Sequence, residues 1–295
     1  MKVNEPYAVG CDIGVTHVKL VTVSPAGDVL SRRQIDTLAE RADWPNRVRD
    51  VIREVERERG PANWVGIAAP GLAAPDGRFI AWMQGRLAAV QGLDWAAFLG
   101  RAAPVLNDAQ AALLGEVWQG AARGSQNVML LTLGTGVGGA LMVDGRLLKG
   151  HLGRAGHLGH ISLDPDGTGD IVNTPGSLED AIGNCTVSAR SGGRFTSTHD
   201  LYAAHRTGDA LATHVWQQSV KALAAGVASL VNVADPEVVI IGGGIARAGL
   251  ALFDPLNAML DQFEWRPHGR RARVVPAALG EHAGALGAAW NAINL

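Results

Sequence analysis

The chain opens with three short runs that are typical of β-strands, and in the second of them apolar residues alternate with polar ones. They cover Tyr7–Asp12, Val18–Val23 and Val29–Ile35, and turn sequences separate them. Such runs joined by tight turns predict an antiparallel, three-stranded start. Asn46–Arg59 then carries apolar residues at helical spacing on one face, and Gly60-Pro61 ends this predicted helix.

Beyond residue 60, predicted strands alternate with predicted helices, which is typical of the α/β class. The expected strands are Trp64–Ala68, Pro104–Leu106, Val128–Leu133, Gly139–Val143, Arg146–Lys149, Val238–Ile241 and Ala272–Pro276. The expected helices are one that follows Asn107-Asp108 and ends at Gln119, then Asp209–Val233, Leu250–Leu260 and Ala283–Ile293.

The strand–turn–strand opening returns near residues 128–149, so we expect two copies of one domain plan with a cleft between them. No Pro- or Ser-rich linker separates the copies, and we expect a hinge near residue 106. The smaller α/β domain would comprise residues 1–106 with a C-terminal helix of about 284–295. The larger α/β domain would comprise residues 107–283.

Composition and charge exclude several classes of protein. The chain has 295 residues, of which 47% are hydrophobic and 18% charged, which argues against disorder. A net charge of −2 leaves no basic surplus for a nucleic acid or an anionic membrane. Two cysteines form no disulfide framework, no apolar stretch reaches the ~20 residues of a membrane span, and no signal peptide is recognisable. We therefore expect a soluble cytoplasmic protein.

Glycine is over-represented, with 38 residues in 295 against a usual share of about 7%. Two glycine segments, Asp12–Thr16 and Leu133–Gly139, lie at the turns of the two predicted hairpins. Each combines exposed backbone N–H groups with a threonine hydroxyl, a combination that suits phosphate oxygens. Either one alone is compatible with a plain hairpin turn, but the pair predicts a polyphosphate site. Asp12 is placed to hold Mg²⁺, directly or through water.

Three further segments carry candidate chemistry. Gly242–Gly244 follows an apolar strand and would let an adenosine ring approach the backbone, although neither the dinucleotide nor the P-loop pattern is present. Asn107-Asp108 lies between a strand and a helix, where Asp108 either caps the helix or accepts a hydroxyl proton as general base while Asn107 orients the acceptor. His157 and His160 suggest a metal, but no complete ligand set accompanies them.

Six segments in order resemble the ROK family, the sugar kinases and sugar-responsive repressors of the actin/hexokinase-type (ribonuclease H-like) ATPase superfamily. They are D-I-G-x-T at Asp12–Thr16, G-I-x-x-P-G at Gly66–Gly71, N-D-A at Asn107–Ala109, L-G-T-G-V-G-G at Leu133–Gly139, A-G-x-x-G-H at Ala155–His160 and G-G-G at Gly242–Gly244. The resemblance implies two α/β domains that close around ATP and a sugar, and a homodimer. Family repressors carry a helix-turn-helix module before the first motif. Only eleven residues precede Asp12, so we expect the kinase branch.

The resemblance also implies residue roles. Asp108 would be the general base, and Asn107, His160, Glu179 and Gly71 would belong to the sugar site. Phosphate and nucleotide contacts would come from Gly14, Thr16, Gly134, Thr135, Gly136, Gly242, Gly243 and Gly244, with Mg²⁺ at Asp12.

Two departures from the family pattern stand out. Most bacterial members have a cysteine motif for zinc that starts ten residues after the histidine of A-G-x-x-G-H, and here its cysteine positions hold Asp170, Val172 and Ser177. We therefore expect no structural zinc, and packing and local hydrogen bonds would hold the loop, with Asp170, Asn173 and Thr174 as candidate partners.

The second departure is His157, which stands where glucokinase-like members have Glu. A neutral histidine accepts at one nitrogen and donates at the other, so a charge-assisted contact with the sugar would be lost. We expect ATP-dependent phosphorylation of a hexose-like sugar at a primary hydroxyl. Two alternatives stay open: a kinase for a non-glucose sugar or cyclitol, and a non-catalytic sugar-binding sensor.

Overall fold

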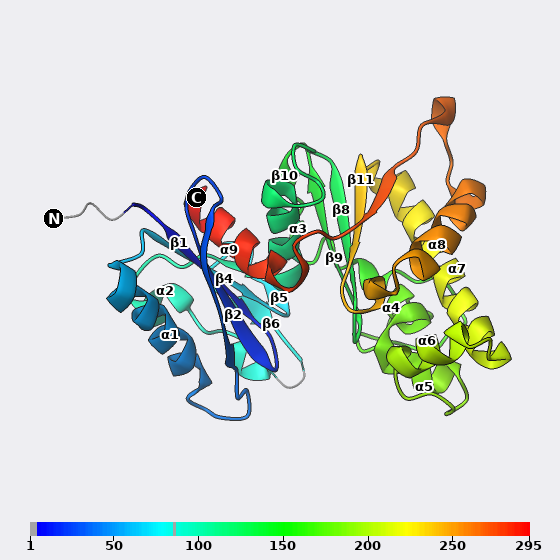
Figure 1. The fold of residues 1–295 in the computed structure, drawn as a ribbon, viewed down its shortest axis with the longest axis horizontal. Helices are drawn as coiled ribbons and strands as arrows, with labels where there is room; N and C mark the ends of the chain where they lie inside the picture. Colours follow the sequence, from blue (N-terminus) through cyan, green and yellow to red (C-terminus); the bar gives the residue numbers. More distant parts are fainter. Residues whose placement is uncertain (1–4, 85–86) are drawn as a thin grey trace. The chain divides into compact units, whose positions relative to one another are not determined.

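The computed structural model of the chain describes residues 5–84 and 87–295. These residues form two compact units, drawn together in Figure 1. Unit 1 extends to Gly124 and adds Leu147–Ala155 and Ala278–Leu295, and unit 2 comprises Ser125–Arg146 and Gly156–Ala277. The predicted α/β class is confirmed in both units, because each contains a mixed sheet with helices.

Unit 1 is built on a five-stranded sheet and a separate two-stranded one. Its strands are β1 (Ala8–Ile13), β2 (His17–Val23), β3 (Val29–Asp36), β4 (Trp64–Ala69), β5 (Leu72–Ala73), β6 (Ile80–Trp82) and β7 (Val105–Asn107). The large sheet has the order β3-β2-β1-β4-β7, with antiparallel pairs from β1 to β3 and parallel pairs from β1 through β4 to β7. The predicted antiparallel start is confirmed.

The helices of unit 1 are α1 (Trp44–Arg59), η1 (Ala88–Val90), α2 (Trp95–Leu99), α3 (Asp108–Gln119), η6 (Gly280–His282) and α9 (Ala283–Ile293). The predicted helix at 46–59 begins two residues earlier than expected, at Trp44, whose ring meets the edge of the fully buried Trp95. Val48, Val51, Ile52 and Val55 complete its apolar face, so amphipathic spacing places α1 on the core as predicted.

The C-terminal helix α9 packs against β1, β4 and α3 with backbone in contact (Figure 1). A Cβ atom on Gly10 of β1 would lie 1.8 Å from the carbonyl oxygen of Ala285, and one on Gly287 would lie 1.7 Å from that of Ala111 in α3. Only glycine permits so close an approach in a packed interior. This contact keeps α3 in unit 1, which therefore extends past the expected hinge at residue 106.

Unit 2 repeats the sheet plan of unit 1. Its strands are β8 (Val128–Leu133), β9 (Val137–Val143), β10 (Arg146–Leu147), β11 (Val238–Gly242) and β12 (Arg273–Pro276). Their order is β10-β9-β8-β11-β12, with β8 antiparallel to β9 and β11 parallel to both β8 and β12. A hairpin followed by parallel strands thus occurs in both units, as the recurring sequence pattern predicted.

The helices of unit 2 are η2 (Leu158–His160), α4 (Leu178–Ile182), η3 (Asn184–Thr186), α5 (Val187–Arg190), α6 (Thr198–Arg206), α7 (Ala210–Ala234), η4 (Ile245–Ala248), α8 (Leu250–Phe263) and η5 (Pro267–Gly269). Apolar periodicity predicts no helix between residues 150 and 208. Helices of four to nine residues are too short to show apolar periodicity. Within the described ranges, no helix combines the length and apolar character needed to cross a membrane.

Replacing Gly287 by alanine should destabilise unit 1 by about 1–3 kcal/mol, because the new methyl group meets the backbone of α3. This is the net cost after the higher helix propensity of alanine, worth about 1 kcal/mol, because a Cβ 1.7 Å from a backbone oxygen forces the two helices apart. Thermal unfolding of the purified chain measures it. Asn291→Ala, at a half-buried position of the same helix, is the control and should leave the midpoint almost unchanged. Equal midpoints for Gly287→Ala and the wild type would contradict the backbone contact.

Candidate functional site

The turn between β1 and β2 holds the first predicted phosphate segment. The N–H of Gly14 donates to the carbonyl of His17 at 2.9 Å and closes the turn. Thr37, which is buried, anchors the turn from outside: its hydroxyl donates to the carbonyl of Gly14 at 2.7 Å and its N–H to that of Thr16 at 2.9 Å. The Gly14 N–H is therefore engaged inside the turn, and this glycine shapes the loop.

Asp12 lies on β1, opposite Lys19 of β2. Its carboxylate rests against the first turn of α9, where a Cβ on Gly284 would come within 2.6 Å of Oδ2. The pKa of Asp12 is raised to about 7, chiefly by burial and secondly by the nearby charge of Asp108, while the charge of Lys19 opposes the rise. A half-buried carboxylate near a second one favours a proton or a cation. Because divalent ions prefer such oxygen ligands, Asp12 fits Mg²⁺.

Asn107 and Asp108 have different roles at the start of α3. Asn107, which is buried, caps the helix: its Oδ1 accepts the N–H of Ala109 at 2.9 Å and that of Gln110 at 3.3 Å. Its amide nitrogen donates to the carbonyl of Gly71 at 2.9 Å and so ties the β4–β5 connection to the helix. The N-cap is Asn107, so the alternative in which Asp108 takes that position is wrong, although Oδ1 of Asp108 also accepts the N–H of Ala109 at 2.8 Å. Asp108 is the first helical residue and is exposed.

The turn between β8 and β9 is tied to the elements behind it. The N–H of Gly134 donates to the carbonyl of Gly136 at 2.9 Å. The carbonyls of Gly134 and Thr135 accept the N–H groups of Asn184 and Cys185 at 3.0 and 2.9 Å. Thr135 is exposed, so its side chain is accessible at the tip of a backbone loop that η3 holds in place.

Glu179, on α4, lies directly behind this turn. Its Oε2 accepts the N–H of Val137 at 2.9 Å, and a Cβ on Gly136 would come within 2.1 Å of the same oxygen. Gly136 is therefore required for the carboxylate to fit. The sequence resemblance implied a sugar contact for Glu179, and the structure adds a hydrogen bond to the glycine loop.

His160 ends η2 and faces a buried carboxylate. Its Nδ1 lies 2.8 Å from Oδ2 of Asp170, and one donor atom from each of His160, Asp170 and Glu179 fall within 4.8 Å of one another. That spacing would allow a shared cation, but the hydrogen bond to Asp170 already uses His160 Nδ1. His157 is half-buried and immediately precedes η2.

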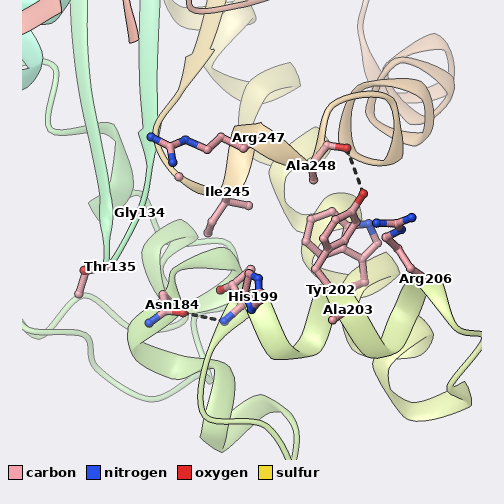
Figure 2. Close-up of a pocket in the computed structure, with 13 residues that line it drawn as sticks. Gly134, Thr135, Asn184, His199, Tyr202, Ala203, Arg206, Ile245, Arg247 and Ala248 are labelled. Carbon is pink, nitrogen blue, oxygen red and sulfur yellow. Dashed lines mark hydrogen bonds between the residues drawn. The ribbon is translucent and has the colours of Figure 1, made fainter. Parts of the chain in front are cut away.

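A cavity of about 560 Å³ lies within unit 2 and joins two of the predicted nucleotide segments (Figure 2). Gly134 and Thr135 line one part, and Gly244 with the following η4 lines another. The other lining residues come from η3, α6 and α7: Asn184, Thr198, His199, Tyr202, Ala203, Arg206 and Trp216. In Figure 2, Arg247 and Arg206 reach the cavity from different sides. An apolar, aromatic cavity with a few polar and cationic groups suits a heteroaromatic ring attached to phosphates.

The aromatic wall is fixed from behind. The hydroxyl of Tyr202 donates to the carbonyl of Ala248 at 3.3 Å (Figure 2), and the indole N–H of Trp216 donates to that of Ala251 at 3.1 Å. The Tyr202 and Trp216 rings lie 5.3 Å apart between centroids. This wall was not predicted, because residues 198–216 carry no glycine motif. The one available signal was the i, i+4 spacing that puts Tyr202 and Arg206 on one helix face.

The three glycines after β11 have different surroundings. Gly244 lines the cavity, and a Cβ there would meet nothing within 4 Å. A Cβ on Gly243 would lie 2.3 Å from the carbonyl oxygen of Leu133, so this residue packs against β8. Gly242 is the buried last residue of β11. Neither Gly242 nor Gly243 is among the described residues that line the cavity.

The whole chain is similar to known proteins. The family described as the ROK family matches residues 8–294. A glucokinase of Thermotoga maritima is 34% identical over 95% of this chain and 95% of its own. A ROK hexokinase structure from Thermus thermophilus is 30% identical with a TM-score of 0.85 and covers 97% of each chain. A Streptomyces griseus ROK glucokinase solved with glucose and AMPPNP is 25% identical with a TM-score of 0.80, over 98% of this chain and 100% of that one. These matches confirm the predicted two-domain fold of the actin/hexokinase type.

Replacing Asp12 by asparagine should flatten the dependence of stability on pH. The pKa of Asp12 is about 7 in the folded chain and about 3.9 in an unfolded one. Between these values the folded state binds more protons, so the wild type loses stability as the pH rises from about 4 to 7. Asp12→Asn removes that loss, and its thermal midpoint should fall several degrees less between pH 5 and pH 8.

The midpoints are measured without nucleotide or divalent ions. Asp50→Asn, which changes an exposed carboxylate on α1, is the control and should keep the wild-type pH dependence. Parallel curves for Asp12→Asn and the wild type would show that Asp12 titrates normally.

Proposed function

The chain belongs to the ROK family and is a glucokinase-like sugar kinase of that family; from this premise we propose that it phosphorylates a hexose-like sugar at a primary hydroxyl, with ATP as donor and Asp108 as general base. The observation that carries the role of Asp108 is the arrangement at the start of α3. Asn107 caps the helix, and the carboxylate of Asp108 is left exposed beside Asp12.

In the proposed reaction Asp108 accepts the proton of the sugar hydroxyl. The hydroxyl oxygen bonds to the γ-phosphorus of ATP as the bond to the β–γ bridging oxygen breaks, and the products are a sugar phosphate and ADP. Phosphoryl transfer depends mainly on positioning and charge stabilisation. Asn107 helps to position Asp108, because it caps α3 and donates a hydrogen bond to the carbonyl of Gly71.

We assign the nucleotide to the cavity of unit 2. Its aromatic wall suits the adenine ring, and the adjoining Gly134–Gly136 turn with Thr135 suits phosphate oxygens. Gly244 leaves open space for the ribose, whereas Gly242 and Gly243 help to position the turn that follows β11. In unit 1, the Thr16 hydroxyl at the Gly14 turn is assigned to phosphate contact.

Asp12 would hold the Mg²⁺ that accompanies ATP, directly or through water. The ion would neutralise charge on the phosphate oxygens. The raised pKa of Asp12 supports this assignment, because it marks a negative charge that the protein leaves largely uncompensated.

The sugar site in this proposal includes His157, His160, Glu179 and Gly71. His157 in place of the Glu of glucokinase-like members favours the alternative acceptors, a non-glucose sugar or a cyclitol. We also keep the homodimer and the cytoplasmic location as part of the proposal. Two free cysteines, Cys11 and Cys185, agree with a reducing compartment.

Asp108→Asn should lower kcat by at least a hundredfold, because a positioned general base contributes about 10²–10⁴-fold. ATP affinity should stay within about twofold, since Asp108 acts on the acceptor hydroxyl. A coupled ADP-release assay measures kcat, and calorimetry measures ATP binding. The control Asp50→Asn should behave as the wild type. Near-normal turnover of Asp108→Asn would remove Asp108 as the base. Sugar binding without any ADP release by the wild type would favour the sensor alternative.

His157→Glu should raise kcat/KM for glucose about tenfold, because it restores a charge-assisted hydrogen bond. The wild type and the variant are compared on glucose, other hexoses, amino sugars and cyclitols. His151→Glu makes the same change at an exposed nearby position and should leave the ranking of acceptors unchanged. Glucose as the best acceptor of the wild type would remove the alternative of a non-glucose substrate. An unaltered ranking in His157→Glu would place His157 outside the sugar site.

A further inference from the structure

The buried carboxylate of Asp170, in unit 2, holds both the ring of His160 and the turn at residues 170–174. The side chain of Asp170 is 0% exposed and that of His160 is 25% exposed, and Oδ2 of the former lies 2.8 Å from Nδ1 of the latter. The other oxygen of Asp170 accepts the N–H groups of Val172 and Thr174, each at 2.9 Å. The same side chain therefore fixes the imidazole ring and closes the turn at 170–174.

The hydrogen bonds around Asp170 determine which atom carries each proton. Burial raises the pKa of this carboxyl, but hydrogen bonds from His160, Thr174, Val172 and Ser177 outweigh it, so the net pKa lies below its ordinary value. An ionised carboxylate can only accept hydrogen bonds. At 2.8 Å, Nδ1 of His160 must therefore be the donor, and in a neutral ring Nε2 keeps its lone pair.

We propose that Asp170 is a positioning residue for the sugar: it fixes His160 as the Nδ1–H tautomer, so that Nε2 accepts a hydrogen bond from a sugar hydroxyl. The proposal rests on the proposed function, in which His160 contacts the sugar. Asp170 acts through His160 and does not itself touch the substrate.

The residues present do not fit the structural zinc that the family pattern implies. Structural zinc sites have four ligands, most of them cysteine sulfurs. Here Val172 offers no ligand atom, and the hydroxyl of Ser177 caps α4 by accepting a backbone N–H. Asp170 instead makes hydrogen bonds to the backbone of the loop and to the ring of His160. This carboxylate therefore holds the loop and orients the ring through hydrogen bonds.

A carboxylate is required at residue 170 because an amide would move the ring proton of His160 from Nδ1 to Nε2. In Asp170→Asn, Oδ1 can still accept the N–H groups of Val172 and Thr174. The amide NH₂ would then face Nδ1 of His160 and donate to it, which puts the ring proton on Nε2. The sugar hydroxyl would meet a donor where it previously met an acceptor.

The first measurement is the tautomer of His160 by ¹⁵N NMR at pH 8, with the signal assigned by its loss in His160→Gln. In the wild type we expect a protonated Nδ1 and an unprotonated Nε2, and in Asp170→Asn the reverse. A wild-type ring with the proton on Nε2, or on both nitrogens, would overturn the proposal. This wild-type spectrum does not depend on whether a variant folds.

The second measurement is the kinetics of Asp170→Asn with the best acceptor. The KM for sugar should rise at least tenfold, while the KM for ATP and kcat change no more than about threefold. Ser162→Ala is the control for loop loosening, because it removes a 2.7 Å hydrogen bond to the carbonyl of Pro175 without touching Asp170 or His160. Equal sugar KM values for Asp170→Asn and the wild type, or an equal rise in Ser162→Ala, would contradict a positioning role.

Metal analysis of protein purified without added metal completes the test. We expect far less than one zinc per chain, and stoichiometric zinc that Asp170→Asn removes would contradict the inference. The three measurements distinguish a failure of this proposal from a failure of the proposed function. If no sugar were phosphorylated, the proposed function would fail, while the tautomer and the metal content would still decide the role of Asp170.

Discussion

The direct backbone contact of α9 with β1, β4 and α3 is the constraint on which the arrangement of unit 1 depends. Glycines at Gly10, Gly66 and Gly287 leave no Cβ atoms in these contacts, and carbonyl oxygens of the facing elements occupy the space. Asp12 follows Gly10 on the same strand, and Asp108 begins the helix that α9 holds. The two carboxylates are therefore positioned by packing of main chain on main chain, which leaves little freedom for side-chain rearrangement.

In unit 2, glycine also leaves room for a neighbouring group, at the turn between β8 and β9. Gly136 leaves room for the carboxylate of Glu179, which in turn holds the N–H of Val137. A buried Asp170 orders the neighbouring loop and its histidine. Much of the glycine surplus thus serves close packing, and Gly134 and Gly244 are the cavity-lining glycines where a Cβ would meet open space. Glycine enrichment near a ligand site therefore has two causes, access for the ligand and access for supporting carboxylates.

Sequence periodicity predicted the long elements of both sheets, because strands buried on both faces and helices such as α7 leave strong apolar patterns. It also predicted the repeated hairpin plan. The backbone contacts of α9 could not be predicted from the sequence, since close contacts at glycine positions have no periodic signature. The short helices α4 to α6 and the aromatic wall at Tyr202 and Trp216 were missed for a related reason. Motif spacing located Asp108 and Asn107, but only the structure distinguishes the helix cap from the exposed carboxylate.

The central claim is transfer of a phosphoryl group from ATP to a primary hydroxyl of a sugar. It is tested most directly by ³¹P NMR of the product formed from ATP and the best hexose acceptor, with ADP measured in the same sample. The account predicts one phosphate monoester signal, split into a triplet by the two protons of a CH₂ group, in an amount equal to the ADP. A doublet from a ring CH group, or inorganic phosphate as the sole product beside ADP, would contradict it.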